Sequence, residues 1–336
     1  MSWGAGLAAS LLVVLPRPAT WIVGLAAFLV RGGILLFLFP IIVVPSPVGL
    51  ANVLGPTITT FWLGGMSLGF ATLVTAIFAA FFLWLVIGGW VAAVTERDLI
   101  ELVVADEELG AGGTIPHPSP ARRRGRIWRI FLLRFAAYVP LAVALGYGSL
   151  RLVQATYREL TLPSDVVTPI AWRVVTAVPD AVFLIVATWV LGETLGSLGA
   201  RRLVVWGQSL DRAYVGAWAD LLRRPLSTLG TFALPLVVTA VLVTPILLAA
   251  GLIWDFLRRE LSGAGGDDGV VLLLTMLAFV ATWCAALLVA ALASAWRSAA
   301  FTVDTVRTRG TFGALRHGST GEWNRSEASG SLERPA

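Results

Sequence analysis

Six long apolar stretches alternate with short polar ones along the chain. They cover residues 21–44, 70–94, 130–150, 174–198, 229–253 and 270–293. Each holds roughly 20–25 residues, and a helix of that length, rising ~1.5 Å per residue, crosses about 30 Å of hydrocarbon. Because a helix satisfies its own backbone hydrogen bonds in lipid, the pattern predicts an all-α polytopic membrane protein with six transmembrane helices.

A different periodicity occupies residues 201–224, just before the fifth apolar stretch. Large apolar side chains recur there every three or four positions: Leu203, Trp206, Leu210, Tyr214, Trp218 and Leu221. A helix carries such positions on one face. We therefore expect an amphipathic helix lying flat in the inner headgroup layer. The alternative is a helix packed against other cytoplasmic segments.

Composition agrees with a bilayer environment. Hydrophobic residues make up 57% of the 336-residue chain and charged residues only 13%, about half the charged fraction of soluble domains. The net charge of +5 comes from arginines that cluster between the apolar stretches, which is the pattern that orients membrane helices. We therefore expect no nucleic-acid partner. The expected partners are the lipid bilayer and either other membrane proteins or further copies of this chain.

Arginine is distributed unevenly between alternate connections. Eighteen arginines fall on one side of the membrane and five on the other, so the arginine-rich side is predicted to be cytoplasmic, with both termini inside. The basic residues are all Arg and the chain is rich in Ala, Gly, Val and Leu. This usage suggests a GC-rich bacterial genome and hence a bacterial inner (plasma) membrane.

The remaining segments complete the predicted organisation. Residues 1–309 are expected to form a single transmembrane domain. The connection 105–127 changes from acidic to Gly/Pro-rich to basic, which predicts a flexible cytoplasmic loop. Residues 310–336 are polar without periodicity and are predicted to be a disordered cytoplasmic tail.

Catalytic motifs find little support. The stretch "GMSLG" matches G-x-S-x-G, but the only histidines, His117 and His317, are predicted on the opposite side of the membrane from Ser67, where neither could serve as its base. The chain has no H-E-x-x-H motif and, lacking lysine, no P-loop. Cys284, the single cysteine, is expected to be a small core residue. We predict no enzyme, no cofactor and no metal site.

Four charged residues fall inside the apolar stretches: Arg31, Arg134, Asp180 and Glu193. A charge at mid-bilayer costs about 2.5–3.5 kcal/mol on insertion scales, so it normally faces protein or water and has a partner. Arg134 and Glu193 lie at similar depths in consecutive spans. We therefore predict that they form an ion pair.

Asp180 allows two interpretations. If a helix begins at Pro179, Asp180 occupies its first turn at the outer interface. If the helix begins near Ile170, Asp180 lies about 15 Å deeper and could reach Arg31. Asp180 and Glu193 are about 220° apart around a helix, so they do not form one carboxylate pair.

Arg31 lies about 15 Å along the helix axis from Trp21, and the glycines that follow it in "RGG" favour a break in the helix. One interpretation is a discontinuous span that presents Arg31 to a cavity and an anionic ligand or lipid headgroup. The other is a buried Arg31 satisfied by carbonyl groups or by Asp180. Two functions stay open: a non-enzymatic membrane component that binds lipid or partner proteins, or a permease or channel subunit with a polar site near Arg31.

Overall fold

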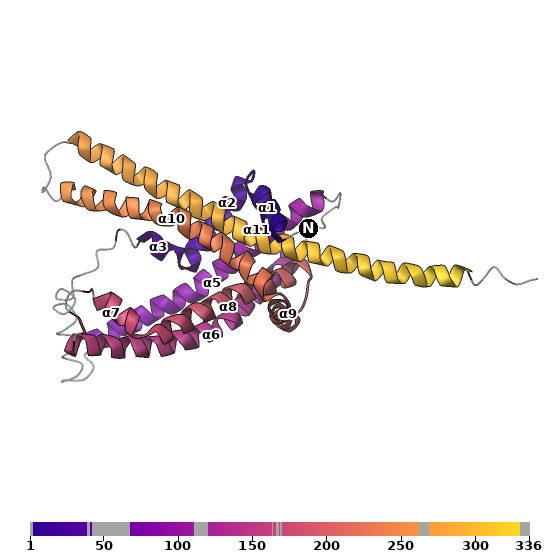
Figure 1. Ribbon diagram of the computed structural model, residues 1–336, viewed down its shortest axis with the longest axis horizontal. Coiled ribbons are helices and arrows are strands. Elements are labelled where there is room, and N and C mark those ends of the chain that lie inside the picture. The colour runs from indigo at the N-terminus through magenta and orange to yellow at the C-terminus, as the bar shows by residue number, and fades with distance from the viewer. Residues whose placement is uncertain are drawn as a thin grey trace, which may run out of the picture. The chain divides into compact units, whose positions relative to one another are not determined.

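The structure, a computed structural model, is helical almost throughout (Figure 1). It describes residues 3–38, 41, 68–110, 120–162, 164, 165, 168, 170–261 and 269–329. Within these ranges there is no β-strand. The fold class predicted from the apolar pattern, an all-α polytopic membrane protein, is therefore confirmed.

Among the described residues, six helical segments are long and apolar enough to cross a bilayer. They are Pro18–Leu38, Ala71–Ala105, Gly125–Glu159, Pro179–Val205, Pro225–Leu261 and Gly269–Val306. Each overlaps one predicted span, and most extend beyond it. The apolar pattern marks only the part of a helix within lipid, whereas the backbone hydrogen bonds continue into the polar flanks.

Long helices carry five of these spans: α5 (Leu68–Gly110), α6 (Pro120–Thr161), α8 (Pro179–Val205), α10 (Pro225–Leu261) and α11 (Gly269–Ser329). The predicted flexible loop 105–127 is therefore helical at both ends, and residues 111–119 lie outside the described part. Likewise α11 continues to Ser329, where disorder was predicted from residue 310. Adding residues to an existing helix does not incur the cost of nucleating a new one. The apolar pattern does not contain this effect, so it placed the helix ends too early.

The chain divides into two compact units, although the sequence predicted a single domain over 1–309. Unit 1 comprises Met1–Pro16, Arg97–Leu234 and Trp296–Ala336, and unit 2 comprises Arg17–Glu96 and Pro235–Ala295. Helices α5, α10 and α11 contribute residues to both. Large apolar side chains remain exposed on the spanning helices, including Phe78 and Phe82 of α5, as expected where the surrounding solvent is lipid.

Unit 1 is built on the pairing of α6 with α8. Ile130, Leu133 and Leu195 are fully buried in this unit. A short N-terminal helix, α1 (Trp3–Val14), is tied to it by the Trp3 indole, whose Nε1 donates to Thr231 Oγ1 at 3.0 Å. This hydrogen bond gives the indole nitrogen a partner in an apolar setting.

Unit 2 contains the first span in three short pieces: α2 (Pro18–Phe28), the π-helical turn η1 (Leu29–Gly33) and α3 (Ile34–Leu38). Phe37 of α3 is buried in a cluster with Val243 and Leu247 of α10 and with Ala286 and Ala290 of α11. Residues 39, 40 and 42–44 of the predicted span lie outside the described part of the chain.

The amphipathic segment 201–224 is two elements rather than one helix. Residues 201–205 complete α8, the chain turns at Gly207 with φ +65°, and α9 runs from Leu210 to Arg223. A positive φ is readily accessible only to glycine. The prediction that Leu203 and Trp206 belong to the same helix as Leu210 was wrong, because the turn at Gly207 ends one helix before the other begins.

Candidate functional site

Arg134 and Glu193 meet between α6 and α8 within unit 1. The Arg134 Nη1 lies 3.4 Å from Glu193 Oε2, and Arg134 Nη2 donates to Ser197 Oγ at 3.1 Å. The Tyr138 hydroxyl donates to the other carboxylate oxygen of Glu193. Both charged residues are at most 9% exposed. The predicted pair is thus present, with two neutral partners that sequence reasoning did not identify.

Two further arginines extend this arrangement. Arg297 of α11 brings Nη2 to 4.0 Å from Glu193 Oε2. Arg201, only 1% exposed, donates from Nη1 to the Ser197 carbonyl at 2.7 Å and from Nη2 to Ser298 Oγ at 3.0 Å. We call these residues the buried polar cluster: Arg134, Tyr138, Glu193, Ser197, Arg201, Arg297 and Ser298. The guanidinium groups of Arg134 and Arg297 both lie within 4.0 Å of the Glu193 carboxylate, and the cluster joins α6, α8 and α11.

Glycines allow α8 to approach α6 closely enough for these contacts. A Cβ added at Gly192 would lie 2.9 Å from Tyr138 Cδ1 and 3.0 Å from the Ala137 carbonyl oxygen, and one at Gly196 would lie 2.7 Å from Arg134 Cδ. Gly192 and Gly196 form a G-x-x-x-G motif, "GETLG", which packs membrane helices at short distance. That motif was the available sequence signal for this interface.

Asp180 lies elsewhere in unit 1, in the first turn of α8. Tyr147 donates its hydroxyl to Asp180 Oδ2 at 2.7 Å, and Arg151 Nη2 lies 3.4 Å from Oδ1. Pro179 begins the helix, as in the interfacial interpretation of this residue. The other interpretation required a continuous helix from near Ile170, whereas the preceding α7 (Ile170–Ala177) ends before Pro179, because proline lacks the backbone N–H that would continue the helix.

Arg31 pairs with an acid that sequence reasoning missed. In unit 2, Arg31 Nη2 lies 2.7 Å from Glu96 Oε2, and Glu96 is 3% exposed. Gly32, at φ +101°, interrupts the helix beside the pair. The run of exposed apolar residues on α5 ends at Val91, so Glu96 lies beyond that run. Through this pair Arg31 lies near the polar end of the α5 span.

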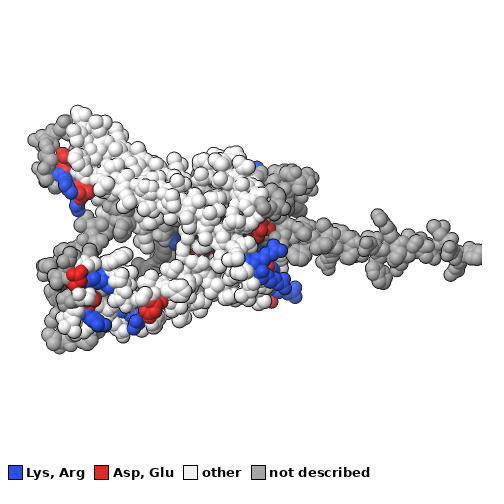
Figure 2. All heavy atoms as spheres, viewed as in Figure 1, with Lys and Arg blue, Asp and Glu red and all other residues white. Residues whose placement is uncertain are grey.

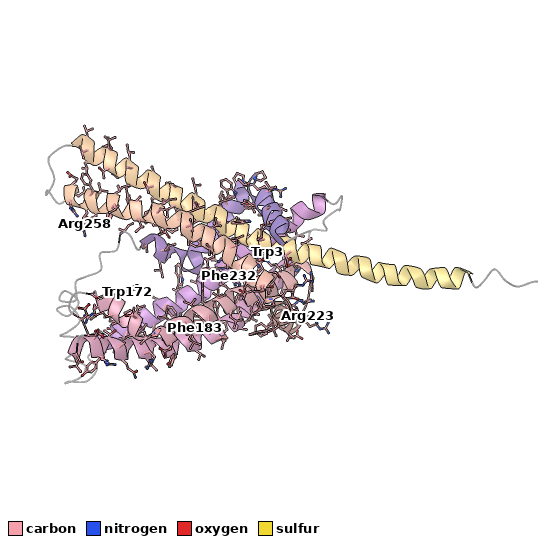
Figure 3. The ribbon with its side chains drawn as sticks, in the orientation of Figure 1. Trp3, Trp172, Phe183, Arg223, Phe232 and Arg258 are labelled. Atoms are coloured by element: carbon pink, nitrogen blue, oxygen red, sulfur yellow. The ribbon has the colours of Figure 1, made fainter. Side chains whose placement is uncertain are left out.

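The surface helix α9 carries three kinds of side chain. Ala213, Ala217 and Leu221 are buried on one face. On that side α9 is also held by Asp220, whose Oδ2 lies 2.7 Å from Arg202 Nη2. The exposed side carries apolar Val215 and Leu222 together with charged Asp211, Arg212 and Arg223. Figure 2 shows arginines gathered over α9, and Figure 3 shows Arg223 at its surface.

The start of α9 favours a charged carboxylate. The Ser209 hydroxyl, followed by the backbone N–H of Arg212, holds the pKa of Asp211 below its ordinary value. An acidic side chain in the first turn also interacts favourably with the helix dipole. Asp211 is therefore ionised at neutral pH, and it is the acid closest in sequence to the exposed Arg212.

The charged side chains that the structure describes form ion pairs between helices and exposed charged surface on α9. Among the described residues, no group of three or more His, Cys, Asp or Glu side chains is placed to hold a metal ion. The residues Ser67 and His117 lie outside the described part of the chain, as does the side chain of His317. No protein-family model, curated protein or solved structure matches this chain.

Proposed function

We propose that this integral membrane protein is a non-enzymatic membrane component that binds lipid or partner proteins through its outer surfaces. The arginine asymmetry of the connections supports both termini in the cytoplasm, and the Arg-only, Ala- and Gly-rich composition supports a bacterial plasma membrane. One observation carries the proposal: each of the four candidate charges is bonded to a side chain on another helix.

These contacts account for the cost of placing charge in a membrane protein. Arg134 meets Glu193, Arg31 meets Glu96, and Asp180 meets Arg151. An intramembrane charge is expected to have such a partner, and breaking a buried pair by removing one partner costs about 3–5 kcal/mol. The internal charges are therefore accounted for by helix assembly, which leaves exposed surfaces for recognition.

The first test asks what remains bound to the protein. The full-length chain is extracted from its native membranes in mild detergent, and the retained lipids and proteins are identified by mass spectrometry. A defined lipid class or a stoichiometric protein is expected. Recovery of the protein with only bulk lipid, in the proportions of the source membrane and with no protein partner, would contradict the proposal.

A second candidate function, a permease or channel subunit with a polar site near Arg31, is favoured by one observation. The π-helical turn and the positive φ of Gly32 directly adjoin Arg31, and broken helices of this kind form substrate sites in transporters. Proteoliposome flux of chloride and of inorganic phosphate tests it. Flux that is abolished in an Arg31→Gln variant of normal folding would favour the permease over the binding component.

A further inference from the structure

Two adjacent arginines stand exposed where the surface helix α9 meets the spanning helix α10. Arg223 ends α9, Arg224 separates the helices, and Pro225 begins α10. Leu222 and Leu226, on either side, are 73% and 87% exposed. We call Leu222, Arg223, Arg224 and Leu226 the basic corner. It combines apolar and cationic exposed side chains within five consecutive residues.

The sequence that follows the basic corner indicates its depth in a bilayer. Residues 225–254 contain no charged side chain, and the next charge is Asp255. At ~1.5 Å per residue these 30 positions extend about 45 Å, which matches the roughly 40–45 Å thickness of a bilayer including its headgroup regions. The arginines of the basic corner therefore lie in a headgroup layer, and the exposed leucines beside them face lipid.

The exposed side of α9 continues this surface. Val215 is 67% exposed and Arg212 is also exposed. Helical geometry places the apolar pair Val215 and Leu222 roughly 60–100° around the axis from Arg212 and Arg223. An interfacial helix places apolar side chains below the headgroups and cationic ones among them.

Charge balance at this surface favours an anionic occupant. The nearby acid Asp220 is paired with Arg202, at 2.7 Å, and Asp211 lies a full helix length away at the other end of α9. Arg223 and Arg224 form no ion pair with any residue that the structure describes. Arginine binds phosphate through a planar set of donors, often in a bidentate manner.

We propose that the basic corner is a binding site for the phosphate headgroup of an anionic phospholipid. The lipid phosphate contacts Arg223 and Arg224, and its acyl chains lie along Leu222, Leu226 and the exposed Leu229 and Leu234 of α10. The inference rests on the proposed function, because it names the lipid class and the surface through which this membrane component recognises its surroundings.

The test compares two arginine pairs at opposite ends of α10. The variant is Arg223→Gln/Arg224→Gln. The matched control is Arg258→Gln/Arg259→Gln, which removes an equally adjacent and exposed pair whose charges already meet Asp255. Full-length protein in neutral detergent is titrated with phosphatidylglycerol or phosphatidylcholine, and bound lipid is counted by native mass spectrometry.

We expect the wild-type protein to bind phosphatidylglycerol more tightly than phosphatidylcholine. The affinity for phosphatidylglycerol should fall on the order of tenfold in Arg223→Gln/Arg224→Gln, because the variant removes both cationic contacts to the lipid phosphate. It should stay within about twofold in the control. Arg223→Lys/Arg224→Lys, which keeps both charges, should lose less than the glutamine variant.

Three results would overturn the proposal. The first is equal affinity of the wild-type protein for the two lipids, and the second is an equal loss in the variant and in the control. The third is thermal stabilisation by inorganic phosphate alone equal to that by phosphatidylglycerol, which would indicate a free-anion site. If the proposal fails while a protein partner still co-purifies, the broader proposed function stands. Recovery of the protein with bulk lipid alone would contradict both proposals.

Discussion

Glu96 is a buried carboxylate whose energetic cost is offset by an arginine 65 positions earlier in the chain. The Arg31–Glu96 pair lies directly beside the helix break at Gly32, so it can fix how the first span bends. Desolvating two charges is costly, and a buried pair is therefore better evidence for a specified geometry than for net stability. Removing one partner should be much worse than removing both.

The first prediction tests this coupling. Arg31→Gln should lower the free energy of unfolding by about 3 kcal/mol, because a nearly buried carboxylate loses its ion-pair partner. The double variant Arg31→Gln/Glu96→Gln should lose less than the sum of the two single variants. Denaturant or thermal unfolding of the purified protein in detergent provides the measurement.

An exposed pair in the same unit serves as control. Arg258 lies 2.7 Å from Asp255 with both side chains at least 39% exposed, and exposed pairs contribute about 0–1 kcal/mol. Arg258→Gln should therefore change stability little. Strict additivity of the Arg31 and Glu96 substitutions would show that the buried pair does not couple them.

At the scale of elements, the α6–α8 interface depends on two glycines of α8, which carry no side chain. Gly192 and Gly196 allow the helices to approach, and the approach is what brings Arg134 and Tyr138 to Glu193. Close packing and interhelical hydrogen bonds are the main forces that associate helices in lipid, where burial of apolar surface gives little advantage. The same glycines therefore serve both packing and electrostatics.

The second prediction concerns Gly192→Ala. Its new Cβ would meet Tyr138 and the Ala137 carbonyl oxygen at 3.0 Å or less, so the helices must separate. We expect a loss of about 1–3 kcal/mol in the free energy of unfolding, as for overpacked cores. Thermal melting in detergent measures it.

The matched control is Gly146→Ala in the same unit, where nothing lies within 4 Å of the added Cβ. Alanine has the higher helix propensity, so this variant should be neutral or slightly stabilised. Equal melting temperatures for the two variants would show that close approach at Gly192 is not required.

At the scale of the whole molecule, the threading of the chain through the membrane governs where each surface acts. The arginine-rich connections are predicted to stay in the cytoplasm, and that bias would place α9 and the basic corner at the inner leaflet. The leaflet matters for function, since the cytoplasmic leaflet commonly carries the anionic lipids.

The third prediction tests this threading with single cysteines in a Cys284→Ala background. Arg212→Cys reports on α9 and Leu261→Cys on the far end of α10; both positions are exposed. In intact cells a membrane-impermeant maleimide should label only Leu261→Cys, and Arg212→Cys should react after permeabilisation. The reverse pattern would invert the orientation, and labelling of both in intact cells would contradict the threading.

Sequence alone determined the solvent, the fold class and the six spans. Hydropathy is a local property, and any stretch of about 20 apolar residues must cross lipid as a helix whatever its neighbours are. The Arg134–Glu193 contact was also accessible, because consecutive antiparallel spans bring residues of similar depth together. The break after Arg31 followed from two adjacent glycines.

Tertiary structure decided which charges meet and where the helices bend. Glu96 lies 65 positions from its partner Arg31, and Arg201 and Arg297 joined the cluster through contacts between α8 and α11. The turn at Gly207 likewise divided a stripe that looked continuous. Such contacts join residues far apart in the chain, and their energies depend on geometry and burial that a linear pattern of residues does not contain.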